Sequence, residues 1–328
     1  MEKIRLGTIG SGIIVHHILD AVIRTEGIEL EAVYSRTREK AQALAEQYGG
    51  KKIYTDMDAF LADPEVDMVY IATPNLLHYP QAKKALLAGK HVLLEKPFTT
   101  KAEHARELVA LAKEKGLYLI DAVPTAYLPN LKLLKQQIPK VGRIRLVMSN
   151  YSQYSSRYDQ VLAGEVPNMF NPDYAGGCLM DINFYNIYLN VALFGKPKAQ
   201  IYHPNIYPKL VDTSGVMLLQ YEDFVSSNVG AKDTWGINFF QIEGEKGYIY
   251  VEGGSNGFDR IRVVTKTSEE VLNVQPEEDR RFFEVQEVTR LVLKEERQEL
   301  DSRLQTMLAV METLEQGRKA AGIFFPGD

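Results

Sequence analysis

A carboxylate and an ammonium group directly follow an apolar run in Val92-Leu93-Leu94-Glu95-Lys96-Pro97. The apolar residues predict a buried strand, and Pro97 has no N–H with which to continue its hydrogen bonding. In open parallel α/β sheets, ligands bind just beyond the carboxyl ends of the strands. Glu95 and Lys96 are therefore candidates for chemistry in a cleft. The alternative is a surface ion pair that ends an ordinary strand.

A second group of reactive side chains follows Gly176-Gly177, where Asp181 and Tyr185 stand four residues apart. This spacing puts both on one face of a predicted helix, and Tyr188 extends that face. Tyrosine has an ordinary pKa of about 10, so a nearby ammonium is needed to favour the phenolate at neutral pH. Lys96 and Tyr185 together would suit proton transfer. The alternative is a buried aspartate making a local cap beside a core tyrosine.

Alternating strands and helices must position Glu95 and Lys96. This order favours a doubly wound parallel sheet in the first half of the chain. Strands are expected over 3–9, 29–34, near 53, and over 67–72, 91–94 and 117–120. Helices are expected over 13–24, 39–48, 56–62, 78–88 and 101–115.

A glycine turn joins the first strand to the first helix. Gly10 and Gly12 occupy the setting of a dinucleotide fingerprint, in which glycines let backbone N–H groups approach a pyrophosphate at a helix start. Ile13 and Ile14 follow as further candidate cofactor contacts. The third glycine position is Val15, so the match is partial and a purely structural turn stays open.

The end of the second strand carries Ser35, Arg36 and Arg38. NAD sites usually place an acidic residue here, whereas arginine can accommodate a 2′-phosphate. The sequence therefore favours NADP, with NAD as the alternative if these arginines are only solvated at the start of the next helix.

Two central motifs contain the ends of the fourth and fifth predicted strands: Ile71-Ala72-Thr73-Pro74-Asn75 with His78, and Ala88-Gly89-Lys90-His91-Val92-Leu93-Leu94-Glu95-Lys96-Pro97. Together they resemble the signature of the Gfo/Idh/MocA oxidoreductase family, named for glucose-fructose oxidoreductase, inositol dehydrogenase and a rhizopine catabolism protein. Gly176-Gly177 with Asp181 and Tyr185 is similar to the tyrosine version of a later family motif, although Asn183 stands where the family often has glycine.

The resemblance implies a role for each motif residue. Tyr185 would be the acid/base, Lys96 would assist it, and Asp181 would orient a hydroxyl or balance Lys96. His78 could instead simply cap its helix. The implied cofactor contacts from these motifs are Thr73, Pro74, Asn75, His78, Glu95 and Lys96.

The second half of the chain is dominated by strand patterns. Together with the first half it predicts an α/β protein, in which an N-terminal Rossmann doubly wound parallel sheet precedes a C-terminal α+β domain with a mostly antiparallel, open-faced sheet. The domains are expected at 1–122 and 123–297, with a last helix at about 298–328 that returns to the first domain. The resemblance implies a homodimer or homotetramer formed through the C-terminal sheet. The expected strands are 143–151, 200–203, 215–221, 226–232, 238–243, 248–252 and 260–265.

Composition restricts the class of protein. The 328 residues are 45% hydrophobic and carry a net charge of −5, which argues against a nucleic-acid partner. Cys178 is the only cysteine, which rules out an intrachain disulfide. No apolar run predicts a signal peptide or a membrane span, so a cytoplasmic protein is expected. No histidine pair has metal-ligand spacing, and no metal is expected.

These observations predict an NAD(P)-dependent oxidoreductase that moves a hydride between nicotinamide and a carbinol or carbonyl carbon of a sugar, cyclitol or diol-like substrate. Two alternatives remain: a family member that cleaves glycosides through a retained nicotinamide, and a nucleotide-binding regulatory protein without catalysis. Arg157 could bind an anion or form a surface ion pair. Candidate substrate contacts are Tyr151, Gln153, Tyr154, Arg157, Tyr158, Asn168 and Asn171.

Overall fold

The computed structural model describes residues 2–207, 211–276 and 279–328. The chain divides into two units: unit 1 comprises Met1–Tyr127 and Glu277–Gln305, and unit 2 comprises Leu128–Pro276 and Thr306–Asp328. The sequence led us to expect 123–297 as one domain and 298–328 returning to the first. In this division 277–305 belongs to unit 1 instead, and 306 onward belongs to unit 2.

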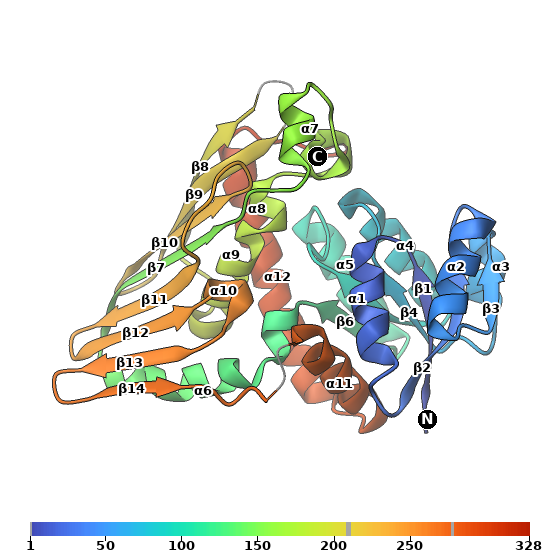
Figure 1. Ribbon diagram of the computed structural model, residues 1–328, viewed down its shortest axis with the longest axis horizontal. Coiled ribbons are helices and arrows are strands. Elements are labelled where there is room, and N and C mark those ends of the chain that lie inside the picture. Colours follow the sequence, from blue (N-terminus) through green and yellow to red (C-terminus); the bar gives the residue numbers. More distant parts are fainter. Residues whose placement is uncertain (1, 208–210, 277–278) are drawn as a thin grey trace. The chain divides into compact units, whose positions relative to one another are not determined.

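Unit 1 is built on a six-stranded parallel sheet with the order β3-β2-β1-β4-β5-β6, which confirms the predicted Rossmann-type fold. Helices α4 and α5 contact each other, and α1 contacts both α2 and α11. Figure 1 shows these helices around the blue and teal strands. The strands are β1 Ile4–Ile9, β2 Ile28–Tyr34, β3 Lys52–Tyr54, β4 Met68–Ile71, β5 His91–Glu95 and β6 Leu119–Ala122. The helices are α1 Ile13–Val22, α2 Arg38–Tyr48, α3 Met57–Ala62, α4 Asn75–Leu87, α5 Ala102–Glu114, η1 Pro124–Tyr127 and α11 Arg280–Leu293, followed by the first part of α12 Arg297–Ala320.

The central strands of unit 1 are apolar on both faces. Leu6, Val33, Val69 and Leu94 are all fully buried. Helix-covered parallel sheets need such continuous apolar runs, because neither face meets water. This burial fixes the strand register, so the residues that follow each strand lie together at the carboxyl edge of the sheet.

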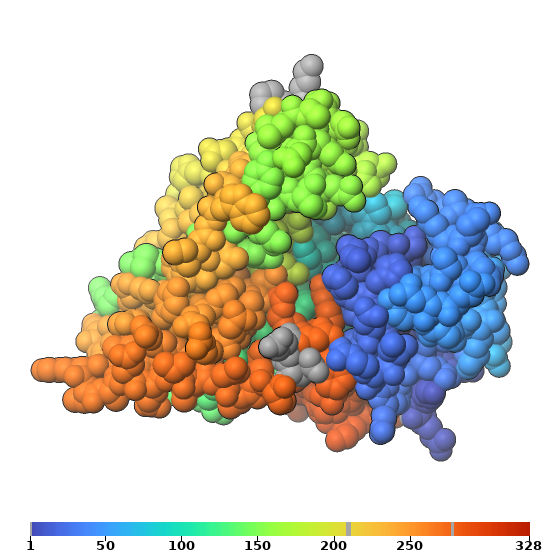
Figure 2. All heavy atoms as spheres, viewed as in Figure 1, coloured from blue at the N-terminus to red at the C-terminus, as the bar shows by residue number. Residues whose placement is uncertain are grey.

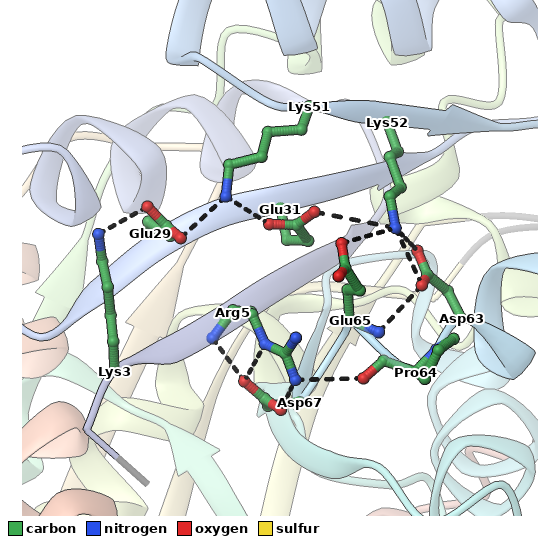
Figure 3. Close-up of polar contacts among 10 residues, drawn as sticks. All are labelled: Lys3, Arg5, Glu29, Glu31, Lys51, Lys52, Asp63, Pro64, Glu65 and Asp67. Atoms are coloured by element: carbon green, nitrogen blue, oxygen red, sulfur yellow. Dashed lines mark hydrogen bonds and ion pairs between the residues drawn. The ribbon is translucent and has the colours of Figure 1, made fainter.

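The amino-terminal ends of the same strands carry a network of charged residues (Figure 3). The Arg5 guanidinium donates to both carboxylate oxygens of Asp67, at 2.9 and 2.7 Å, and so ties β1 to the start of β4. Lys51 bridges Glu29 and Glu31 of β2, at 3.0 and 2.8 Å. These contacts lie at the opposite ends of the strands from Glu95 and Ser35.

Unit 2 is built on an eight-stranded sheet with the order β14-β13-β12-β11-β7-β10-β9-β8. All neighbouring pairs are antiparallel except β7 with β10, which confirms the predicted mostly antiparallel sheet. The strands are β7 Ile144–Ser152, β8 Ala199–Ile206, β9 Asp212–Gln220, β10 Val225–Ala231, β11 Phe239–Gly244, β12 Gly247–Glu252, β13 Ile261–Thr265 and β14 Glu269–Leu272. The helices are α6 Pro129–Gln137, η2 Ile138–Val141, α7 Tyr158–Leu162, η3 Asn168–Phe170, η4 Pro172–Tyr174, α8 Cys178–Asp181, α9 Asn183–Phe194 and α10 Gly254–Gly257.

Helices α8, α9 and α10 contact this sheet (Figure 1). On the helix-covered face, Asn228 of β10 is buried and accepts a hydrogen bond from Asn190 of α9 at 2.7 Å. The preceding residue on β10, Ser227, is half-buried and lies in register with Leu218 and Met148 on the other face. That second face is the predicted open face.

The sequence missed β14, α10 and the five-residue helix α7. Strand β14 is a four-residue edge strand that contains two glutamates, and α10 is a single turn that begins at Gly254. No helix in the part of the chain that the structure describes is long and apolar enough to cross a lipid bilayer.

Candidate active site

The glycine turn after β1 contains two glycines with different requirements. Gly10 has φ of +124°, and a Cβ there would lie 2.4 Å from the carbonyl oxygen of Ala72, so a side chain is excluded. Gly12 is the N-cap of α1, has no side-chain cap, and a Cβ there would meet no atom within 4 Å. Packing does not require a glycine at Gly12. The space beside the first N–H groups of α1 therefore fits a group such as a pyrophosphate.

The end of β2 places Ser35, Arg36 and Arg38 at different depths. Ser35 is buried and its N–H donates to the Tyr54 carbonyl at 3.1 Å, whereas both arginines are exposed. Neither guanidinium has a hydrogen bond or ion pair with any residue in the described part of the chain. Two exposed cations at this strand end suit a phosphate group.

The turn after β4 leads into α4 earlier than the sequence suggested. The expected helix opened at His78, but α4 begins at Asn75 with Pro74 as its N-cap. The reason is that Pro74, with its fixed φ, precedes the helix directly, so His78 lies in the first turn rather than before it. The Thr73 hydroxyl donates to Gln81 Oε1 at 2.7 Å, which holds the turn against the helix.

The His78 ring lies between two loops. Its Nε2 is 2.8 Å from the Thr73 carbonyl oxygen, and its Nδ1 is 2.8 Å from the Pro97 carbonyl oxygen. Burial lowers the pKa of His78, although the two carbonyl groups oppose this shift. A neutral imidazole has one N–H and donates to only one of these carbonyls. His78 thus links the loops after β4 and β5 through backbone contacts and is not a helix cap.

Glu95 and Lys96 lie at the carboxyl end of β5, as expected. Glu95 is buried, and its carboxylate accepts hydrogen bonds from the Tyr70 hydroxyl at 2.7 Å and from the Lys96 N–H at 3.1 Å. Lys96 is half-buried, and the Lys96-Pro97 peptide bond is cis, a point that the sequence left open.

Two charged residues of α11, Arg281 and Glu284, lie near the Glu95 carboxylate. Arg281 Nη1 lies 3.6 Å from Glu95 Oε1 and 2.8 Å from Glu284 Oε2. Burial raises the pKa of Glu284 to about 7, and Arg281 opposes this shift. Tyr70, Arg281 and Glu284 were not predictable from the sequence, because each is far from Glu95 along the chain and none belongs to a motif.

In unit 2, the predicted single helix through Asp181 and Tyr185 is two helices. Asp181 is the last residue of α8, and Tyr185 lies in the first turn of α9, with Ile182 between them. Asn183 explains the break, because its buried side-chain amide donates to the Asn228 carbonyl of β10 at 3.2 Å. The start of α9 is therefore held by the sheet and does not continue the path of α8.

The Gly176-Gly177 pair is required by the start of α8. Gly177 has φ of +118°, and a Cβ there would lie 2.2 Å from Asp212 Oδ1. Asp212 accepts hydrogen bonds from the Leu179 N–H and the Tyr202 hydroxyl, both at 2.6 Å, and so caps α8 from β9. Burial raises the pKa of Asp212 to about 6. The same burial raises the pKa of the Cys178 thiol, which does not favour a thiolate nucleophile.

Asp181 forms an ion pair within its own unit. Its Oδ2 lies 2.7 Å from Lys232 Nζ, and Lys232 directly follows β10. The sequence suggests that Asp181 either orients a substrate hydroxyl or balances Lys96, and it does not identify Lys232. Nothing in the sequence near Lys232 identifies it, because the pair spans 51 residues.

Tyr185 is buried beside a second tyrosine. The rings of Tyr185 and Tyr151 pack edge to face with centroids 6.0 Å apart. The Tyr151 hydroxyl is 3.1 Å from Gln153 Oε1 and accepts a hydrogen bond from the Asn256 amide at 2.7 Å. Tyr188, the predicted extension of this face, is buried against Phe184 instead.

The other candidate substrate residues lie in the segment 151–174, which is at the surface in Figure 2, coloured light green. Tyr154 stacks on Trp235 at 5.6 Å, and Tyr158 contacts both Tyr154 and Phe170. Asn171 forms a local turn by accepting from the Asp173 N–H at 2.8 Å. The side chains of Gln153, Arg157 and Asn168 are exposed.

Comparison with protein families matches both units. Residues 4–121 match an oxidoreductase family with an NAD-binding Rossmann fold, abbreviated GFO_IDH_MocA. Residues 136–250 match the GFO/IDH/MocA C-terminal domain.

Individual proteins match over nearly the whole chain. The scyllo-inositol 2-dehydrogenase (NADP(+)) of Bacillus subtilis is 33% identical over 326 residues, which is 99% of each chain. The D-xylose 1-dehydrogenase (NADP(+)) of Hypocrea jecorina is 29% identical and covers 91% of this chain and 85% of its own. A 3-ketoreductase from Actinomadura kijaniata, solved with NADP and TDP-benzene, shares the fold with a TM-score of 0.83 at 23% identity, over 96% of this chain and 98% of its own.

Proposed function

The chain belongs to the Gfo/Idh/MocA oxidoreductase family, and on that premise we propose that it is an NADP-dependent oxidoreductase. Its substrate would be a sugar, cyclitol or diol-like compound, oxidised at a carbinol carbon or reduced at a carbonyl carbon. The observation that carries this proposal is the strand–turn–helix at Gly12, where open space adjoins the start of α1. The names of the inositol and xylose dehydrogenases support both the cofactor and the substrate class.

The dinucleotide would be held by the carboxyl edge of the unit 1 sheet. The Gly12 turn, with Gly10, Ile13 and Ile14, would receive the pyrophosphate. Arg36 and Arg38, with Ser35, would bind the 2′-phosphate, because their guanidinium groups are exposed at the end of β2. The turns after β4 and β5 would contact the nicotinamide half through Thr73, Pro74, Asn75, His78, Glu95 and Lys96. When bound, the nicotinamide supplies the hydride chemistry.

The protein would supply the proton. Tyr185 would donate to or accept from the substrate oxygen, as general acid–base catalysis requires a group within hydrogen-bond reach. Lys96 would assist Tyr185 in this proton transfer. Asp181, which is partly exposed while Lys232 is buried, would bind a substrate hydroxyl.

A fluorescence titration with NADPH and, separately, NADH tests the cofactor assignment. We expect NADPH to bind at least about tenfold more tightly, since a charge-assisted hydrogen bond contributes about 1.5–3 kcal/mol. Arg36→Ala should weaken NADPH binding and leave NADH binding unchanged. A preference for NADH would keep an oxidoreductase and overturn the role of the arginines. If neither binds, denaturing the protein shows whether a nucleotide was already bound.

Turnover of Tyr185→Phe tests the catalytic assignment, once a panel of sugars, cyclitols and diols has identified a substrate. We expect kcat to fall by about 10²- to 10⁴-fold, because the proton donor is lost. Lys96→Ala should be at least as damaging. Near-full turnover by Tyr185→Phe would contradict the role of Tyr185, while unchanged NADPH binding would show that the variant is folded.

We further propose that two copies associate through the open face of the unit 2 sheet. Its half-buried residues include Leu218, Met148 and Tyr250, which share one cross-strand row with Ser227 and Gln241, so large apolar side chains recur across the face. A second copy would cover this surface, because a twofold axis brings the same face of both copies together.

A further inference from the structure

Lys232 is a buried cation held beside Asp181. Its side chain is 3% exposed, and its Nζ lies 2.7 Å from Asp181 Oδ2 and 3.3 Å from the Met169 carbonyl oxygen. The ammonium also lies over the Phe170 ring, 4.5 Å from the centroid. An ammonium has three N–H donors. Here it lies against a carboxylate oxygen, a carbonyl oxygen and an aromatic ring.

The backbone of Lys232 is fixed on both sides. Its N–H donates to the Thr213 carbonyl of β9, and its carbonyl accepts from the Ser155 N–H, both at 2.8 Å. The backbone from which the ammonium extends is therefore held between β9 and the start of the 151–174 segment. A cation placed this firmly orients the carboxylate that it binds.

The two members of the pair differ in exposure. The Asp181 side chain is 30% exposed, whereas the Lys232 side chain is 3% exposed. A buried charge is costly unless it is paired and hydrogen-bonded. Lys232 therefore supports Asp181 from within the protein, and the exposed part of the pair is the carboxylate.

Other ionisable groups surround the pair without replacing Asp181. Asp212 accepts from the Leu179 N–H and the Tyr202 hydroxyl, and Asp233 accepts from the hydroxyls of Thr213 and Ser214. These two carboxylates act through space on the buried Cys178 thiol of α8, as do Asp181 and Lys232. Asp233 also acts on Tyr158 of α7. Among the described residues, Asp181 is the carboxylate within ion-pair distance of Lys232.

We propose that Lys232 is a positioning residue that keeps Asp181 charged and fixed in the orientation that the reaction uses. The inference rests on the proposed role of Asp181 in substrate binding. Lys232 itself need not touch substrate or cofactor, since it acts through the carboxylate.

The first test is a double-mutant cycle on kcat and KM with Lys232→Met, Asp181→Asn and the double variant. We expect Lys232→Met to lower kcat/KM by about 10- to 100-fold, because a small misplacement of a binding group is costly. In the Asp181→Asn background the same change should cost less than about twofold. Lys232→Arg should restore most of the activity, and the exposed Lys266→Met is the matched control. Equal losses in both backgrounds would overturn the inference.

The second test measures the pair without needing activity. Carbon-13 NMR of labelled aspartate, assigned by comparison with Asp181→Asn, gives the titration of Asp181. We expect the Asp181 pKa to rise by about 1 unit or more in Lys232→Met, since an opposite charge this close favours the carboxylate. The acid limb of the pH–rate profile should move by the same amount. NADPH binding and thermal unfolding will show whether Lys232→Met folds. If it does not, Lys232→Gln replaces it in both tests.

The outcomes separate the inference from the proposed function. An unmoved Asp181 titration overturns the inference, whether or not the protein is an oxidoreductase. A wild-type protein without redox turnover on the substrate panel overturns the proposed function, and the titration then still decides whether Lys232 controls Asp181. A moved titration with additive losses in the cycle overturns the positioning role and leaves only a structural ion pair.

Discussion

At the scale of single residues, Arg5 and Asp67 test how the charged network of Figure 3 contributes to stability. Asp67 accepts from the Arg5 guanidinium at 2.7 and 2.9 Å and from the Arg5 N–H at 3.0 Å. Burial alone would raise the pKa of Asp67, but the Arg5 donors outweigh burial and lower it. Asp67→Asn should reduce the free energy of unfolding at pH 7 by about 2 kcal/mol, because hydrogen bonds to a charged group are lost.

The pH dependence of that loss has a definite sign. A carboxyl whose pKa is lowered by folding adds stability above its unfolded pKa of about 4, and the contribution disappears as the pH falls through the folded value. The wild-type and Asp67→Asn unfolding curves in urea should therefore converge below pH 4. Burial lowers the pKa of His91 to about 4 and Asp67 opposes that shift, so the loss of Asp67 also changes how His91 titrates. A difference that stays constant down to pH 2 would contradict the ion-pair account.

Residue types predicted some members of the candidate site and not others. Glu95 and Lys96 were predictable because they directly follow an apolar run, and the structure places them at the end of β5. Lys232 and Arg281 were not, because each reaches its partner across a long stretch of chain. A motif records neighbours in sequence, whereas these contacts exist only after the sheet has formed.

At the scale of elements, the turn into α1 offers a matched pair of substitutions. Gly12→Val places its side chain in open space with an allowed φ of −80°, so the unfolding midpoint should change little. It should weaken NADPH binding at least about tenfold, because the side chain would occupy the space proposed for the pyrophosphate. Thermal unfolding and fluorescence titration measure the two effects.

Gly10→Val is the contrasting variant. Its φ of +124° and the 2.4 Å approach to the Ala72 carbonyl should destabilise the protein directly. If Gly12→Val binds NADPH as tightly as the wild type, the pyrophosphate does not lie at the start of α1.

Strand and helix positions were largely predictable from periodicity. Among the described residues, all six strands of unit 1 and seven of the eight in unit 2 lie where the apolar patterns placed them. The break between α8 and α9 was not predictable, because Ile182 is an ordinary helix residue and the cause is the Asn183 contact with β10. Strand β14 was missed because its first two residues are glutamates, so the segment shows no alternation of apolar and polar residues.

At the scale of the whole molecule, the open sheet face predicts an oligomer. Sedimentation velocity should give a dimer or tetramer for the wild type and a monomer for Leu218→Glu, because an unpaired carboxylate would be buried at the centre of the interface. Leu87→Glu, an exposed position on α4, is the control and should not change the mass. A wild-type monomer at micromolar concentration would contradict the proposal.

The class of fold was predictable at this scale, but the path of the chain through it was not. The alternation of strands and helices indicated the Rossmann-type sheet, and the later strand patterns indicated the second sheet. The parallel pairing of β7 with β10 joins strands about 80 residues apart in sequence. No local pattern records such a pairing, because it depends on how the intervening chain folds.

The route of the polypeptide has a consequence for exchanging parts between relatives. Unit 1 consists of two stretches, and its second boundary falls between Gln305 and Thr306, inside α12. A chimera that borrows the nucleotide-binding half of another enzyme must therefore import both stretches and be spliced within a continuous helix. Grafts that join two proteins only near residue 127 would pair an incomplete first half with a foreign α11, so changes of cofactor preference are better sought by point substitution.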